Sequence, residues 1–202
     1  MTIRVAMADD QALVRGALAA LLDLEPDLTV VGEAESGSAL LRLLATTEAD
    51  VVLVDVEMPD MDGIEATEAI RRSFPATKVL VVTTFGRPGY LRRAVQAGAA
   101  GFVVKDTPAR QLADTVRRVH SGLRVVDPAL AADSLARGES PLTTRETDVL
   151  RAAAAGGSVS DIADEVNLSE GTVRNHLSSI IGKTMARNRA DAARIAQQSG
   201  WL

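Results

Sequence analysis

The chain has 202 residues, 47% hydrophobic and 24% charged, which suits one large or two small globular domains. It has no cysteine and 2 histidines, which excludes disulfides and thiolate metal sites and makes a protein zinc site improbable. The net charge of −5 argues at first against nucleic acid, and the absence of a long apolar run predicts a cytoplasmic protein without a membrane partner.

The first 120 residues alternate short apolar runs with amphipathic helical segments. The expected strands are Ile3–Ala8, Leu28–Ala34, Asp50–Asp55, Lys78–Thr83 and Gly101–Val104. The expected helices cover 11–24, 37–47, 63–73, 88–97 and 108–121. Three of the strands are apolar throughout, as is typical of strands buried on both faces of a parallel sheet. Five such β-α repeats predict an α/β fold, a doubly wound five-stranded parallel sheet in a domain over residues 1–121.

The pattern breaks after residue 121. Gly122, Pro128, Gly138 and Pro141 punctuate the next stretch, which contains one short helical segment, Ala129–Ala136. We therefore expect residues 122–140 to be a linker with a short helix.

Residues 141–202 have only helical patterns, with readable caps. The four helices are expected to begin at the caps Thr143 with Glu146, Ser158 with Asp161, Ser169, and Asn188. In the same order, they are expected to end at Gly156-Gly157, near Asn167, at about Lys183, and at Gly200. A short helix, a turn and a second helix, flanked by helices, predict an all-α four-helix domain with a helix-turn-helix.

The charge of the last 32 residues differs from that of the whole chain. Residues 171–202 hold five basic side chains and one acidic one, a net charge of +4. A locally basic segment on an acidic protein is typical of a DNA-binding surface, although a solvated helix face explains the charge equally well.

Polar side chains stand at the carboxyl ends of several expected strands. Asp9 and Asp10 follow the first strand, Asp55 ends the third, Thr83 ends the fourth and Lys105 follows the fifth. In a doubly wound sheet such positions gather in one crevice, where clustered carboxylates require a counter-charge. Mg²⁺ prefers such oxygen ligands, and a carboxylate can attack phosphorus to give an acyl phosphate. The alternative for any single aspartate is a helix cap or loop residue.

These residues resemble the receiver domains of two-component response regulators. The motifs are Asp9-Asp10, the run from Val54 to Gly63 around Asp55 with Pro59, Thr83-Thr84 and Val104-Lys105-Asp106. The resemblance implies a flavodoxin-like domain in which a sensor histidine kinase phosphorylates Asp55. It also implies that Asp10, Asp55 and the backbone carbonyl of Glu57 bind Mg²⁺ and that Asp9 supports the ion through water. Thr83 matches the switch hydroxyl, Phe102 the switch aromatic and Lys105 the phosphate contact, although Phe102 can equally be a plain core aromatic.

The carboxy-terminal motifs resemble the LuxR-type helix-turn-helix of the FixJ/NarL response regulators. They are Leu142 to Glu146 and Leu168 to Leu177. The resemblance places the recognition helix at residues 170–183, with Val173 and Leu177 facing the core. We expect Arg174 and Asn175 to contact base edges, with Thr172 and Ser178 on the same face, and Lys183, Arg187 and Arg189 to contact phosphates. His176 is interpreted as a packing or phosphate-contact residue. Ser178 and Thr184-Met185 depart from the common family pattern.

The resulting hypothesis is a transcriptional regulator, not an enzyme, that becomes a homodimer on phosphorylation and binds paired half-sites on double-stranded DNA. A candidate interface is the apolar surface of the first and fifth helices, with Leu13, Val14, Leu112 and Val116. The rivals are an aspartate phosphatase, a DNA-binding protein independent of phosphorylation, and a structural adaptor. The phosphatase chemistry requires a second acid two residues after its nucleophile and a cap domain. Here position 57 is Glu, and the partner domain is a helix-turn-helix.

Overall fold

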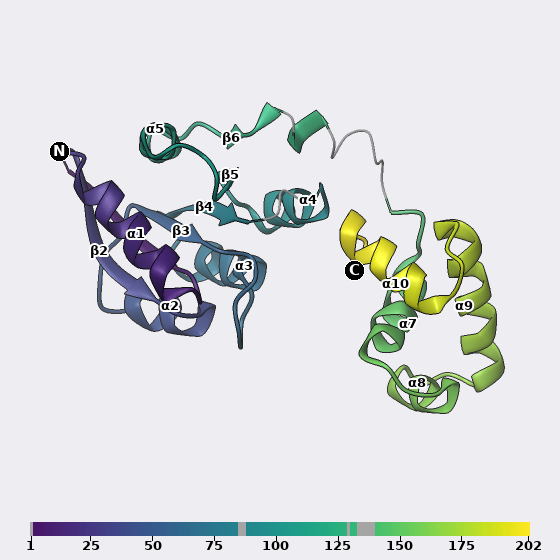
Figure 1. Ribbon diagram of the computed structural model, residues 1–202. Coiled ribbons are helices and arrows are strands. Elements are labelled where there is room, and N and C mark those ends of the chain that lie inside the picture. Colours follow the sequence, from purple (N-terminus) through teal and green to yellow (C-terminus); the bar gives the residue numbers. More distant parts are fainter. Residues whose placement is uncertain (1, 85–87, 129, 133–139) are drawn as a thin grey trace. The chain divides into compact units, whose positions relative to one another are not determined.

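The computed structural model describes residues 2–84, 88–128, 130–132 and 140–202. They form two compact units, an amino-terminal one that extends to Ala131 and a carboxy-terminal one that holds residues 140–202 (Figure 1). No helix of the described ranges is both long enough and apolar enough to cross a membrane.

The amino-terminal unit is built on a parallel sheet with the strand order β2-β1-β3-β4-β5-β6. Its strands are β1 (Ile3–Ala8), β2 (Leu28–Ala34), β3 (Val51–Val54), β4 (Lys78–Thr83), β5 (Gly101–Val104) and β6 (Val125–Val126). The prediction of five strands was one short, because β6 pairs with β5 through Gly101 opposite Val125 and Phe102 opposite Val126. Two residues are too few to show a periodic pattern, so the sequence placed them in the linker.

Helices cover both faces of the sheet, which confirms the doubly wound architecture (Figure 1). They are α1 (Ala12–Asp23), α2 (Gly37–Leu44), α3 (Gly63–Ser73), α4 (Pro88–Ala97) and α5 (Ala109–His120). One core packs α1 and α5 against the sheet, and the other packs α2, α3 and α4 against the opposite face. The strand order reverses direction between β1 and β3, so the carboxyl ends of these strands border a crevice.

The predicted apolar surface on α5 is wrong. Leu112 and Val116 are 3% and 0% exposed, because both pack in the core between α5 and the sheet. On α1, Leu13 is 86% exposed and Val14 is half-buried. Helix α5 therefore has one apolar stripe, which the sheet already covers, and no second one for a dimer.

The carboxy-terminal unit contains α7 (Thr144–Ala155), α8 (Val159–Glu165), α9 (Glu170–Thr184) and α10 (Arg189–Ser199). Each starts at a side chain that caps a free backbone N–H, as predicted: Thr143, Ser158, Ser169 and Asn188. Val173, Leu177 and Ile180 of α9 are buried in the common core of the four helices. Most of the expected linker helix 129–136 lies outside the described residues, and residues 130–132 are helical.

Candidate functional site

Three aspartates meet at the carboxyl ends of β1 and β3. One carboxylate oxygen from each of Asp9, Asp10 and Asp55 lies within 4.8 Å of the others. Asp9 and Asp55 are buried, whereas Asp10 is exposed at the mouth of the crevice. The fold thus assembles the acidic cluster that the strand ends predicted, with one open side toward solvent.

Lys105, which follows β5, bridges the two buried aspartates. Its ammonium lies 2.7 Å from Asp9 Oδ2 and 2.9 Å from Asp55 Oδ2. Burial raises the pKa of Asp55 above its ordinary value, and the hydrogen bond from Lys105 opposes this shift. Burial alone lowers the pKa of Lys105, but its hydrogen bonds to Asp9 and Asp55 outweigh burial and raise it. The pocket therefore holds one cation between two carboxylates, and the third carboxylate leaves an excess of negative charge.

The set of carboxylates fits a hard divalent cation. Two oxygens bound to one Mg²⁺, each at about 2.1 Å, lie at most about 4.2 Å apart. The oxygens of Asp9, Asp10 and Asp55 lie within 4.8 Å of one another, so small side-chain movements would bring them to the separation that the ion requires.

The loop after Asp55 turns back sharply toward β3. A Cβ atom on Gly63 would lie 1.9 Å from the carbonyl oxygen of Asp55, so only glycine permits this turn. Asp60 in the same loop adopts a positive φ of 65°. The Tyr90 hydroxyl of α4 donates to Glu57 Oε1 at 2.9 Å. This contact joins α4 to the loop, and the sequence pattern did not predict it.

The two expected switch residues lie in the interior. Thr83 is buried at the end of β4, and its carbonyl accepts from the backbone N–H of Lys105 at 2.8 Å. Phe102 on β5 is fully buried on the face covered by α2, α3 and α4. Both side chains are therefore shielded from the solvent-exposed mouth of the pocket.

The exposed face of α9 carries the predicted DNA contacts. Asn175 and Ser178 are exposed, and their side chains make no hydrogen bond within the described ranges. Arg174 is exposed and pairs with Glu170 at 2.6 Å, and the Thr172 hydroxyl lies 2.8 Å from the hydroxyl of the capping Ser169. Asn175 and Ser178 are thus the polar groups of this face most ready to accept a new partner.

The three basic residues expected at phosphates also have intramolecular partners. Lys183 pairs with Glu146 at 2.7 Å, Arg187 with Asp191 at 3.3 Å, and Arg189 donates to the carbonyl of Gly157 at 2.9 Å. His176 is half-buried. These bonds orient the three cations, and their remaining donors can still face a phosphate.

Glu146 is the residue whose role the sequence showed only in part. It closes the predicted capping box of α7 by accepting from the Thr143 N–H at 2.7 Å. It also accepts from Ser179 Oγ and Lys183 Nζ, each at 2.7 Å. The spacing Thr143 to Glu146 revealed the cap, but no local signal indicated contacts with residues 33 and 37 positions away.

Comparisons with known proteins assign both units. The family model described as response regulator receiver domain matches residues 5–117, and that of the bacterial regulatory proteins of the luxR family matches residues 140–196. The chain is a two-component response regulator. Its family comprises DNA-binding transcriptional regulators of the NarL/FixJ class, which is not a class of enzymes.

Relatives of this regulator match along the whole chain. The transcriptional regulatory protein YvfU of Bacillus subtilis is 46% identical over 200 residues, which cover 99% of this chain and 100% of YvfU. DesR of the same organism is 38% identical and covers 99% of each chain. A solved structure of two RcsB dimers bound to two parallel DNAs matches with a TM-score of 0.72 and 25% identity over 98% of this regulator and 99% of RcsB. Both domains of the regulator therefore have counterparts in its relatives.

Proposed function

We propose that a sensor histidine kinase phosphorylates this regulator on Asp55 and that the modified protein dimerises on paired DNA half-sites. The observation that carries the proposal is the pocket in which Lys105 lies 2.9 Å from Asp55 and the carboxylates of Asp9 and Asp10 lie beside it. In the reaction, a carboxylate oxygen of Asp55 attacks the phosphorus of a phosphohistidine. The nitrogen–phosphorus bond breaks, and its electron pair stays on the histidine of the kinase.

The residues around Asp55 each have a role in this proposal. Asp10, Asp55 and the backbone carbonyl of Glu57 hold Mg²⁺, with Asp9 acting through water. When bound by these residues, the ion would supply positive charge that offsets the negative charge of the phosphoryl oxygens. Lys105 leaves its pair with Asp55 and holds a phosphoryl oxygen of the product.

Thr83 and Phe102 carry the change away from the pocket. The Thr83 hydroxyl donates to the new phosphoryl group, and Phe102 adjusts its packing beneath α4. Phosphorylation thereby shifts a two-state equilibrium of the receiver domain toward the form that dimerises.

The DNA contacts follow from the exposed face of α9. Arg174 and Asn175 read base edges in the major groove, with Thr172 and Ser178 beside them, and Lys183, Arg187 and Arg189 bind phosphates. The DNA-bound dimers of RcsB support this assembly by analogy. We also propose a receiver domain over residues 1–121, a linker over 122–140 whose strand β6 extends the receiver sheet, and a DNA-binding domain over 141–202. The proposed site of action is the cytoplasm, where the DNA is.

The test is the mass of the full chain in solution with Mg²⁺, before and after addition of beryllofluoride. Light scattering is expected to report the 21.2 kDa monomer before addition and twice that mass afterwards. Asp55→Asn, which keeps the size of the side chain but removes its charge, should stay monomeric. Dimerisation of this variant by beryllofluoride, or an unchanged mass of the wild type after its addition, would refute the proposal.

A further inference from the structure

A second polar cavity lies in the receiver unit, at the opposite end of the sheet from Asp55. It has a volume of about 140 Å³ and is bordered by the ends of α3, α4 and α5 and by the starts of β4 and β5. Lys78 opens β4 and Thr83 closes it, and six strand residues span about 17 Å. The cavity is therefore separate from the acidic pocket.

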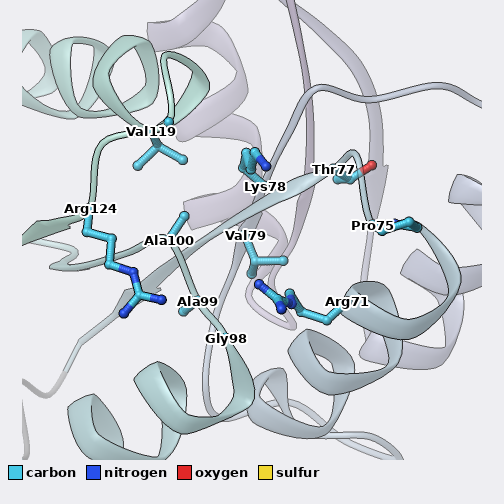
Figure 2. A pocket seen from close by; sticks show the side chains of 11 residues that line it. Arg71, Pro75, Thr77, Lys78, Val79, Gly98, Ala99, Ala100, Val119 and Arg124 are labelled. Atoms are coloured by element: carbon cyan, nitrogen blue, oxygen red, sulfur yellow. The ribbon is translucent and has the colours of Figure 1, made fainter.

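Three cations line this cavity. Arg71 enters from α3, Lys78 from β4 and Arg124 from the segment before β6, and Figure 2 shows the two guanidinium groups reaching toward each other across Ala99. None of the described lining residues is acidic. None of the three side chains makes a hydrogen bond or an ion pair within the described part of the chain.

A cavity whose described lining holds three cations and no carboxylate is unusual in a unit that carries a net negative charge. Residues 1–140 carry 20 acidic and 15 basic side chains, so carboxylates are more common than cations on this surface. Like charges held close together repel one another, and the repulsion is relieved by an anion between them. Several other arginines of this unit form ion pairs with carboxylates, among them Arg4 with Asp50 and Arg117 with Asp27.

The backbone directs Arg71 into the cavity. Gly98, which follows α4, has a φ of +96°, and a Cβ atom there would lie 2.9 Å from Arg71 Nε. The Arg71 side chain therefore lies directly against the backbone at Gly98, a path that a side chain at position 98 would obstruct. Arg71 and Arg124 are exposed and Lys78 is half-buried, so the charged groups border the open side of the cavity, where an anion from solvent can reach them.

We propose that this cavity binds a small phosphate anion with two or more negative charges, of the size of orthophosphate or diphosphate. A volume of about 140 Å³ has room for several water molecules and therefore for an ion of this size. The planar guanidinium groups of Arg71 and Arg124 match the geometry of phosphate oxygens, and Lys78 adds a point charge.

The experiment is a titration of the ¹⁵N-labelled full chain with diphosphate and, separately, with orthophosphate, without Mg²⁺ and at ionic strength held constant with KCl. Amide signals of Gly98, Ala100 and Gly122 are expected to shift in a saturable manner. The stronger of the two ligands identifies whether a single or a double phosphate is preferred.

Variants localise the binding. Arg124→Gln and Arg71→Gln should each weaken binding about 10-fold, because each removes a charge-assisted contact. Arg72→Gln is the matched control, since Arg72 is an exposed neighbour that does not line the cavity, and it should change the affinity less than twofold. Absence of saturable shifts up to 10 mM of either anion, taken as roughly the weakest specific affinity of interest, would overturn the proposal. Equal affinities of the wild type and both cavity variants would also overturn it.

Discussion

The buried carboxylate of Glu146 offers the most direct test of how the DNA-binding unit is held together. The perturbation is Glu146→Gln, which keeps the size of the side chain and removes its charge. Burial alone raises the pKa of Glu146, but hydrogen bonds from Lys183, Thr143 and Ser179 outweigh burial and lower it to about 2. The ionised carboxyl is thus more favourable in the folded unit than in the unfolded chain.

The size of the expected destabilisation follows from the pKa shift of Glu146. A pKa change from 4.5 to about 2 corresponds to an upper limit of about 3 kcal/mol. The side chain of Glu146 is 5% exposed, but that of its partner Lys183 is 36% exposed, so solvent screening reduces the value. We expect Glu146→Gln to lower the free energy of unfolding by about 2 kcal/mol at pH 7.

The contribution of Glu146 to the free energy of unfolding depends on pH in a predictable direction. Because the folded-state pKa is depressed, the contribution is fully present above pH 4.5 and is lost as the pH falls from 4.5 toward 2. The difference between wild type and variant should therefore fall to about half at pH 3.

The assay is urea unfolding followed by the emission of Trp201. This is the only tryptophan, and it packs against the core of the carboxy-terminal unit, so its signal reports that unit. Glu165→Gln, at an exposed glutamate on α8, is the control and should change the stability by less than about 0.5 kcal/mol. An unchanged stability of Glu146→Gln at pH 7, or a difference that does not vary with pH, would refute the reasoning.

Two further predictions concern the loop after Asp55 and the recognition helix. Gly63→Ala should destabilise the receiver unit by more than about 2 kcal/mol in urea unfolding followed by circular dichroism, because its Cβ would lie 1.9 Å from the Asp55 carbonyl oxygen. Gly16→Ala in α1, with no atom within 4 Å of the added Cβ, should be neutral or stabilising, and equal losses for the two variants would contradict the steric cause. Asn175→Ala should weaken operator binding about 10-fold with an unchanged salt dependence, whereas Arg189→Gln should reduce the slope of log affinity against log salt by about 1. Fluorescence anisotropy at several salt concentrations separates the two, and a changed slope for Asn175→Ala would show that this residue does not act on bases.

Local patterns predicted most of the elements. The five main strands and the helices of both units were readable because apolar periodicity and caps act over three or four residues. The capping box of Thr143 and Glu146 is formed as the spacing indicated. Strand β6 was missed because its two residues are held by pairing with β5, a contact that leaves no periodic trace.

The clustering of the three aspartates could also be predicted, because the carboxyl ends of neighbouring parallel strands lie at one crevice. Asp9, Asp10 and Asp55 are more than forty positions apart at the extremes and still form one cluster within 4.8 Å. The sequence could not predict which face of a helix packs against residues from distant parts of the chain. Leu112 and Val116 were expected at a surface, and the packing of α5 on the sheet buries them.

The sequence by itself determined the family, the order of the strands and helices and the residues of the acidic pocket, since each depends on residue type and short spacing. Only the tertiary structure decided that Lys105 bridges Asp9 and Asp55, that Glu146 holds Lys183, and that Arg71 and Arg124 meet at one cavity. The physical reason is that such contacts depend on where separate elements pack, and packing is set by the buried apolar surface of the whole domain rather than by the residues next to each group.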